Sequence, residues 1–172
     1  MHKQSNPSVI NIEKAATNNT NFRTTIWTGP YSQMTLMCIP VCSDIGVEIH
    51  KENDQIIRIE QGNALVKLGK CKERLDLCYT VQKGDTIFIP AGNWHNIINV
   101  GRMALKLSSI YSPAHHKPGT IHITKEDAKK EIMTTRQTGG LLAPIRGSYR
   151  PAPKDAGFHF VQALMPLTRR SP

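Results

Sequence analysis

The stretch GDTIFIPAGNWHNIIN, residues 84–99, decides how this sequence is interpreted. It fits the pattern G-x5-P-x-G-x2-H-x3-N at all five fixed positions, with the histidine at His95. Average residue frequencies give a chance match on the order of 10⁻⁷ per starting position. The residues around the proline and glycine favour two short strands, Thr86–Ile89 and Trp94–Val100.

The rest of the central sequence repeats this strand-like character. Turn residues separate further short runs rich in Ile, Val, Thr, Leu and aromatic residues: Phe22–Thr28, Gln33–Ile39, Gly46–His50, Gln55–Glu60, Ala64–Leu68 and Ala104–Tyr111. About eight short strands without intervening helical patterns favour an all-β antiparallel sandwich or barrel over a parallel α/β sheet.

Composition divides the chain into parts around this strand-rich body. Lys125–Met133 predicts a short C-terminal helix, which Thr124 can cap, and a second helix is weakly indicated near Ile12–Ala16. We therefore expect an N-terminal lead-in, a barrel, a linker with a helix, and an irregular or disordered basic tail rich in Pro and Gly, at residues 1–21, 22–115, 116–133 and 134–172.

Charge and cysteine content exclude several functions. The net charge of +9 invites a nucleic-acid interpretation, but residues 1–115 carry 12 basic and 9 acidic side chains, whereas residues 116–172 carry 10 and 4. Most of the excess therefore lies outside the predicted barrel, and we expect neither a nucleic-acid nor a membrane partner. The spacing of the four cysteines matches no zinc knuckle or disulfide framework, which predicts reduced thiols. The sequence has no apolar run of 18 residues and its polar start does not resemble a signal peptide, so we expect a cytoplasmic protein.

A second histidine lies in the run Gly46–His50. Because side chains alternate across a strand, Glu48 and His50 point to one face and the intervening Ile49 to the other. The pair is either part of a solvated strand face or a pair of metal ligands.

The two motifs together resemble those of the cupin superfamily, whose second motif is the pattern around His95. The first cupin motif, G-x5-H-x-H-x3,4-E-x6-G, is present in altered form as Glu48-x-His50, then four residues to Gln55 and six to Gly62. The resemblance implies a double-stranded β-helix, or jelly-roll barrel, with a metal held by Glu48, His50, Gln55 and His95. The residues in and around the two motifs are most similar to those of small bacterial single-domain cupins of the mannose-6-phosphate isomerase-like group.

The predicted ligand set differs from the family pattern in two residues, since Glu48 replaces a histidine and Gln55 replaces a glutamate. Two imidazoles and one carboxylate suit Fe, Mn, Zn or Ni, while the neutral amide of Gln55 should bind weakly. Some cupins have lost their metal and use the barrel only to bind a ligand, and Gln55 is also consistent with such partial decay.

Further residues are candidates for catalytic roles. Tyr111 could reach the barrel interior, Asp54 adjoins Gln55, and Arg58 could meet an anionic substrate or pair with Glu60. We interpret the His115-His116 pair as part of a surface loop.

These observations favour a metal-dependent enzyme that acts on a small polar, sugar-like or enolisable molecule, as an isomerase or a dioxygenase. The alternative is a non-catalytic cupin module that binds a small molecule. In either case we expect a homodimer; a transcription regulator is disfavoured because the tail has no helix-turn-helix pattern.

Overall fold

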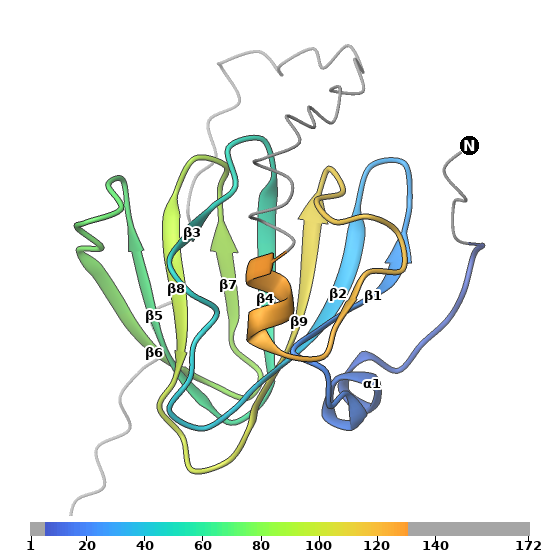
Figure 1. The fold of residues 1–172 in the computed structure, drawn as a ribbon, viewed down its shortest axis with the longest axis horizontal. Helices are drawn as coiled ribbons and strands as arrows, with labels where there is room; N and C mark the ends of the chain where they lie inside the picture. The colour runs from blue at the N-terminus through green and yellow to red at the C-terminus, as the bar shows by residue number, and fades with distance from the viewer. Residues whose placement is uncertain (1–5, 131–172) are drawn as a thin grey trace, which may run out of the picture. The chain divides into compact units, whose positions relative to one another are not determined.

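The computed structural model describes residues 6–130 of the chain. Helix α1 (Ile12–Asn18) comes first, and a short helix over residues 125–130 comes last (Figure 1). Between them lie β1 (Arg23–Thr28), β2 (Gln33–Ile39), β3 (Glu48–Ile49), β4 (Asp54–Gln61), β5 (Asn63–Gly69), β6 (Leu77–Gln82), β7 (Thr86–Ile89), β8 (Trp94–Asn99), β9 (Leu105–Ser112) and β10 (Ile121–His122).

The strands form two antiparallel sheets. One has six strands in the order β10-β1-β2-β9-β4-β7, and the other has four in the order β3-β8-β5-β6 (Figure 1). Strands that follow one another in the chain often lie in different sheets, so the chain winds between the two walls. This is the double-stranded β-helix that the sequence predicts.

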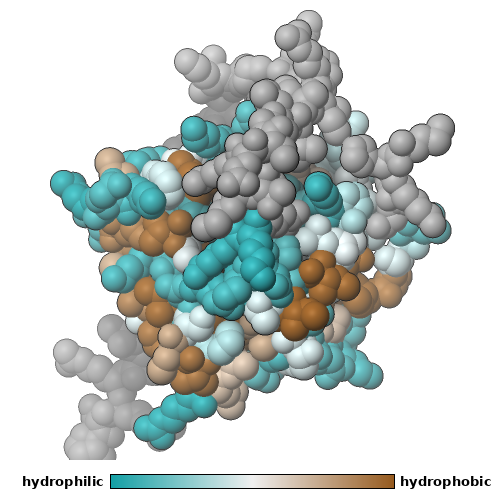
Figure 2. Space-filling view, in the orientation of Figure 1, coloured by the Kyte–Doolittle hydropathy of each residue, from teal (hydrophilic) through white to brown (hydrophobic). Residues whose placement is uncertain are grey.

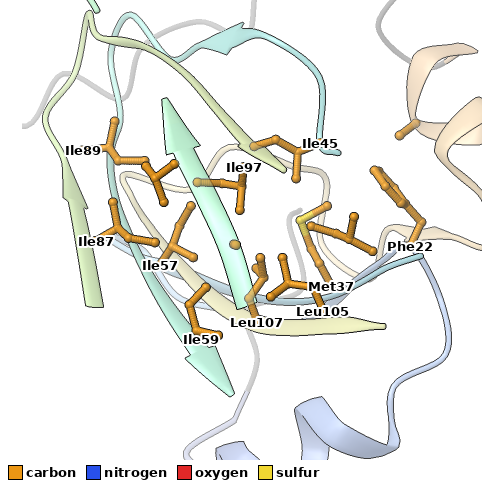
Figure 3. Close-up of a cluster of buried hydrophobic side chains, with 14 residues drawn as sticks. Phe22, Met37, Ile45, Ile57, Ile59, Ile87, Ile89, Ile97, Leu105 and Leu107 are labelled. Atoms are coloured by element: carbon orange, nitrogen blue, oxygen red, sulfur yellow. The ribbon is translucent and has the colours of Figure 1, made fainter. Parts of the chain in front are cut away.

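The inner faces of the two sheets enclose one hydrophobic core. Figure 3 shows Ile57, Ile87 and Leu107 of the six-stranded sheet facing Ile97 of the other. Side chains at alternate positions of each strand point inward, and those of this cluster are almost completely buried. Burial of these apolar side chains is the main source of stability for the barrel.

The inward-facing row changes from apolar to polar toward one end of the barrel. Along β9, Leu105 and Leu107 belong to the core, whereas Ser109 and Tyr111 continue the same row as polar groups. On the neighbouring β4, Gln55 lies opposite Tyr111. This end of the barrel is therefore buried but polar, which is the setting of a binding site rather than of a core.

The predicted strands all form, and the structure adds two. The run Gly46–His50 is shorter than expected, since only two residues of it pair as β3. Strands β6 and β10 were not expected. In β6 nearly every residue is exposed, so it lacks the alternation that marks a half-buried strand. Among residues 6–130 it pairs only with β5.

Both predicted helices are present. The Asn11 side chain caps α1 by accepting a hydrogen bond from the Lys14 backbone N–H (2.9 Å). At the second helix Thr124 and Asp127 cap each other, since Asp127 N–H donates to Thr124 Oγ1 and Thr124 N–H donates to Asp127 Oδ2. The surface over this helix is hydrophilic in the view of Figure 2. The end of the predicted helix at Met133 and the predicted tail 134–172 lie outside the described residues.

The four cysteines are free thiols, as the sequence predicts. Within residues 6–130 no helix is long and apolar enough to cross a membrane.

Candidate metal centre

Three of the predicted ligands come together at the polar end of the barrel. Strands β3 and β8 pair so that Glu48 lies opposite His95, and His50 follows two residues after Glu48 on the same face. One ligand atom from each of the three side chains lies within 4.8 Å of the other two. Among the described residues, this is the one group of three or more His, Cys, Asp or Glu side chains arranged to hold a metal ion.

The turn before β8 connects these ligands. Gly92 has a φ of +77°, a backbone conformation that glycine adopts without strain. In this conformation its N–H donates to the carbonyl oxygen of His50 (2.8 Å). The glycine of the second motif therefore ties the segment that carries His50 to the one that carries His95.

The hydrogen bonding of His95 determines which of its nitrogens is free. Its Nδ1 lies 3.1 Å from the carbonyl oxygen of Asn93, and because that oxygen can only accept, Nδ1 carries the hydrogen. In the neutral ring the lone pair is then on Nε2, which lies 3.4 Å from Glu48 Oε1 and has no hydrogen-bond partner among the described residues. A backbone contact of this kind commonly orients a metal-binding histidine.

The same carboxylate oxygen also faces the second histidine. Glu48 Oε1 lies 3.4 Å from His50 Nε2, and the side chains of His50 and His95 are 6% and 0% exposed. Glu48 Oε1 and the two Nε2 atoms have no hydrogen-bond partner among the described residues, and a cation placed between them would contact all three. The donor set therefore fits a divalent cation.

Glu48 is held in its ionised form. Burial alone would raise the pKa of this carboxyl group, but the contacts with His50 and His95 and the charge of Arg23 lower it well below its usual value. A carboxylate that stays charged can bind a cation without first losing a proton.

Gln55 is positioned at the same end of the barrel by β9. Its Nε2 donates hydrogen bonds to Ser109 Oγ and Tyr111 Oη, both at 3.0 Å, whereas its Oε1 is buried without a partner among the described residues. The Tyr111 ring contacts His50 edge-on, with ring centroids 5.3 Å apart. The free amide oxygen is thus the atom that Gln55 can offer to a ligand.

Tyr111 lies beside the centre, while Asp54 and Arg58 do not. Burial raises the pKa of Tyr111 to about 12, so its phenol stays protonated at neutral pH. Asp54 is exposed and accepts a hydrogen bond from the Ala91 backbone N–H (2.9 Å). Arg58 points out of the barrel, as alternation from Gln55 along β4 requires, and forms an ion pair with the buried Glu60.

His115 and His116 lie in a loop, as the sequence predicts, but this loop packs against the metal centre and both side chains are only partly exposed. The ring of His115 lies 4.3 Å from that of His50, and the ring of His116 lies 4.7 Å from that of His115. Burial lowers the pKa of His115 to about 4 and that of His116 to about 2. The loop after β9 folds back over the barrel, and no periodic pattern in the sequence could have shown this.

Replacing His116 with phenylalanine is expected to make the protein less sensitive to acid. In the folded state His116 stays neutral, whereas in the unfolded chain it binds a proton below its ordinary pKa of 6.5. The wild type therefore loses stability as the pH falls below about 6, by up to about 1.4 kcal/mol per pH unit more than the variant. Urea denaturation with EDTA at about pH 7.5 and about pH 5 measures this difference. Equal losses would show that burial does not keep His116 neutral.

A cavity of about 760 Å³ adjoins this end of the barrel. Its lining includes Leu68 and Ile89, the register partners of His95 and Gln55 respectively. The remaining lining residues come from the end of β5, the start of β6, the connection between them, and β7 with the turn after it. The cavity thus provides space for a small molecule next to the strands that carry the centre.

A family model for the cupin domain matches residues 35–111. The chain also resembles a crystal structure of BH2720 from Bacillus halodurans, with a TM-score of 0.72 and 46% identity over 73% of this chain and 95% of that one. The chain belongs to the cupin superfamily. The matched region contains all four predicted ligands of this cupin.

Curated relatives of this cupin are uncharacterised. The Bacillus subtilis protein YrkC is 50% identical over 122 residues, which are 71% of this chain and 66% of that protein. The protein L612 of Acanthamoeba polyphaga mimivirus is 43% identical over 118 residues, 68% of this chain and 72% of that protein. These relatives identify no reaction, and membership of the mannose-6-phosphate isomerase-like group stays a prediction.

Proposed function

We propose that this cupin binds a divalent metal ion through Glu48, His50 and His95 and acts as a metal-dependent enzyme on a small polar, oxygenated molecule. The observation that carries the proposal is the position of Glu48 Oε1, which lies 3.4 Å from the Nε2 atom of each histidine in a largely buried site. Each of these three atoms lacks a hydrogen-bond partner among the described residues. Buried polar atoms usually have partners, and a cation would supply one to all three.

The donor set limits the choice of metal. Two imidazoles and one carboxylate suit Fe(II), Mn(II), Zn(II) or Ni(II), and no thiolate is present in the group. A bound ion would act as a Lewis acid that polarises a carbonyl or hydroxyl oxygen of the substrate.

The surrounding residues have distinct tasks in this proposal. Gln55 offers its free amide oxygen as a weak fourth ligand, and its hydrogen bonds to Ser109 and Tyr111 keep that oxygen in place. Tyr111 accepts from Gln55 and remains protonated, so its own O–H can donate to a substrate oxygen. These tasks are compatible with isomerisation through an enediol and with oxygen-dependent cleavage of an enol.

Metal analysis of the full chain, purified without a histidine tag, tests the proposal. We expect close to one equivalent of a divalent metal, or stoichiometric binding on reconstitution. Less than about a tenth of an equivalent, with no binding on reconstitution, would contradict the metal centre.

The catalytic part of the proposal needs a second experiment. Protein reconstituted with Fe(II) without oxygen is screened for oxygen uptake, and protein loaded with the other metals for isomerisation, each with small enolisable hydroxyketones and sugars. Turnover by wild type that is lost in the metal-free protein supports the enzyme. Binding of these molecules without turnover would favour the non-catalytic cupin module instead.

A further inference from the structure

A buried arginine points into the barrel from the strand next to β2. Arg23 is the first residue of β1, where it pairs with Met37 of β2 and His122 of β10. It is 5% exposed, and its Nη2 lies 4.0 Å from the sulfur of Met37, a member of the core cluster. The side chain is therefore inside the barrel, on the inward-facing row of the six-stranded sheet.

The charge of Arg23 has no close counter-ion. No carboxylate oxygen among residues 6–130 lies within 4.0 Å of its guanidinium nitrogens, and its buried Nε has no hydrogen-bond partner there. Its described contacts are with neutral groups: the Met37 sulfur, the ring of Phe22 at 5.9 Å, and the phenol of Tyr111. Burying a charge without a partner costs several kcal/mol, so such an arrangement is rarely kept unless something else offsets it.

Strand register places Arg23 beside the polar end of the barrel. Two residues after Arg23, Thr25 pairs with Thr35, which pairs with Ser109, the hydrogen-bond partner of Gln55. Its positive charge favours the ionised form of Glu48 and disfavours protonation of His115 and His116, so it contributes to the pKa shifts of all three. Among the described residues, the titratable groups around Arg23 are Glu48 from β3, Tyr111, the two loop histidines His115 and His116, and its pairing partner His122. Glu48 alone supplies a negative charge. With a divalent ion bound, three positive charges would thus face one negative charge in a buried site.

Two buried hydroxyl groups lie next to Arg23. Thr25 of β1 pairs directly with Thr35 of β2, and the two residues are 7% and 0% exposed. Their Oγ1 atoms have no hydrogen-bond partner in the part of the chain that the structure describes. Thr25 lies two residues beyond Arg23 on the same strand, and hence on the same inward row. The wall around Arg23 therefore offers several hydrogen-bond donors and one positive charge.

We propose that Arg23 binds an acidic group of the substrate, assisted by Thr25 and Thr35, and that this cupin acts on small anions. The inference deepens the proposed function by naming its substrate class. The acidic group lies toward β1, and the other oxygens of the substrate face Glu48, His50 and His95. The anion balances the excess positive charge, and the threonine hydroxyls donate hydrogen bonds to its oxygens.

Binding of simple anions to the full chain tests this assignment. Isothermal titration calorimetry measures the dissociation constants of glycolate, inorganic phosphate and the neutral analogue glycolamide, with metal-free and with Zn(II)-loaded protein. We expect Arg23→Met to weaken binding of the preferred anion at least about tenfold and to change glycolamide binding less than about twofold. The preference between glycolate and phosphate distinguishes a carboxylate from a phosphate substrate.

Two further variants serve as controls. Arg102→Met removes an exposed arginine at the opposite end of the barrel, in the turn between β8 and β9, and should bind both anions like the wild type. Arg23→Lys keeps the charge and should retain part of the anion affinity. Because Arg23 has no close counter-ion, its replacement by methionine should not lower the melting temperature of the ligand-free protein, whereas it should remove the stabilisation that the anion gives.

The outcomes separate this inference from the metal centre. Equal anion affinity in wild type and Arg23→Met, or no binding of either anion to the wild type at about 10 mM, would overturn the role of Arg23. If Arg23→Met loses anion affinity while the wild type binds no metal, the role of Arg23 is supported and the proposed metal centre is contradicted. A melting temperature far below that of the wild type in both Arg23 variants would show that Arg23 stabilises the folded protein, and would contradict the inference.

Discussion

The His95→Ala variant is expected to lose its metal almost completely. His95 is fully buried, its Nε2 faces the Glu48 carboxylate at 3.4 Å, and its Nδ1 is held by the Asn93 carbonyl. Without it one imidazole, one carboxylate and a weak amide remain. Such a set should bind a divalent ion about 100-fold or more weakly than the complete one. Titration with a competing chelator and metal analysis after dialysis measure this loss.

A second histidine variant provides the matched control. His122 is also buried, at 7% exposure, but lies on β10 and outside the group of three ligands. His122→Gln should keep the metal stoichiometry of the wild type. An unchanged metal content in His95→Ala, in a variant whose circular dichroism shows a folded barrel, would mean that the ligands are misassigned.

The Asn99→Ala variant should lose about 2–4 kcal/mol of unfolding free energy while keeping its metal affinity. The Asn99 side chain is 2% exposed, and its Nδ2 donates to the carbonyl oxygens of Ile39, Pro40 and Met103 at 2.9–3.1 Å. Its Oδ1 accepts from the Gly101 N–H at 2.9 Å. Alanine would leave these buried backbone groups without partners, at the point where the end of β2 meets the turn after β8.

Urea denaturation of metal-free protein measures this loss, and metal titration tests whether the site is untouched. Asn99 lies four residues beyond His95, roughly 13 Å along the strand, so the ligands should keep their positions. Asn63, which is exposed at the start of β5, provides the control, and Asn63→Ala should change the stability by less than about 0.5 kcal/mol. A loss for Asn99→Ala no greater than this control, or a loss of metal affinity, would contradict the structural role of Asn99.

The second motif, residues 84–99, gave the most detailed predictions of any part of the sequence. Its residues predict β7, β8 and the placement of His95, and the structure confirms all three. The motif did not show that its five fixed positions have different tasks. His95 belongs to the candidate metal centre, Gly92 provides a turn with a φ of +77°, and Asn99 holds backbone segments together at the far end of the strand. The tasks of Gly92 and Asn99 depend on contacts with His50, directly after β3, and with the end of β2, which a motif does not specify.

The structure decides between the two roles that the sequence left open for Arg58. Its side chain points outward and pairs with Glu60, which is the second of the two alternatives. Arg23 lies near the start of the predicted strand Phe22–Thr28, and no motif or nearby acidic residue in the sequence marks it as functional. The pairing of β1 with β2 and β10 makes it an inward-facing residue, and that pairing joins segments up to about a hundred residues apart.

By itself the sequence determined the fold class, most of the strands and the shared face of Glu48 and His50. These features follow from alternation, turn residues and motif spacing, which act between residues close in the chain. The tertiary structure decided that His95 meets that pair, that His115 and His116 cover the site, and that Arg23 is buried beside it. Each of these depends on which strands become neighbours when the two sheets close around the core, and burial there keeps Tyr111 protonated and His115 and His116 neutral.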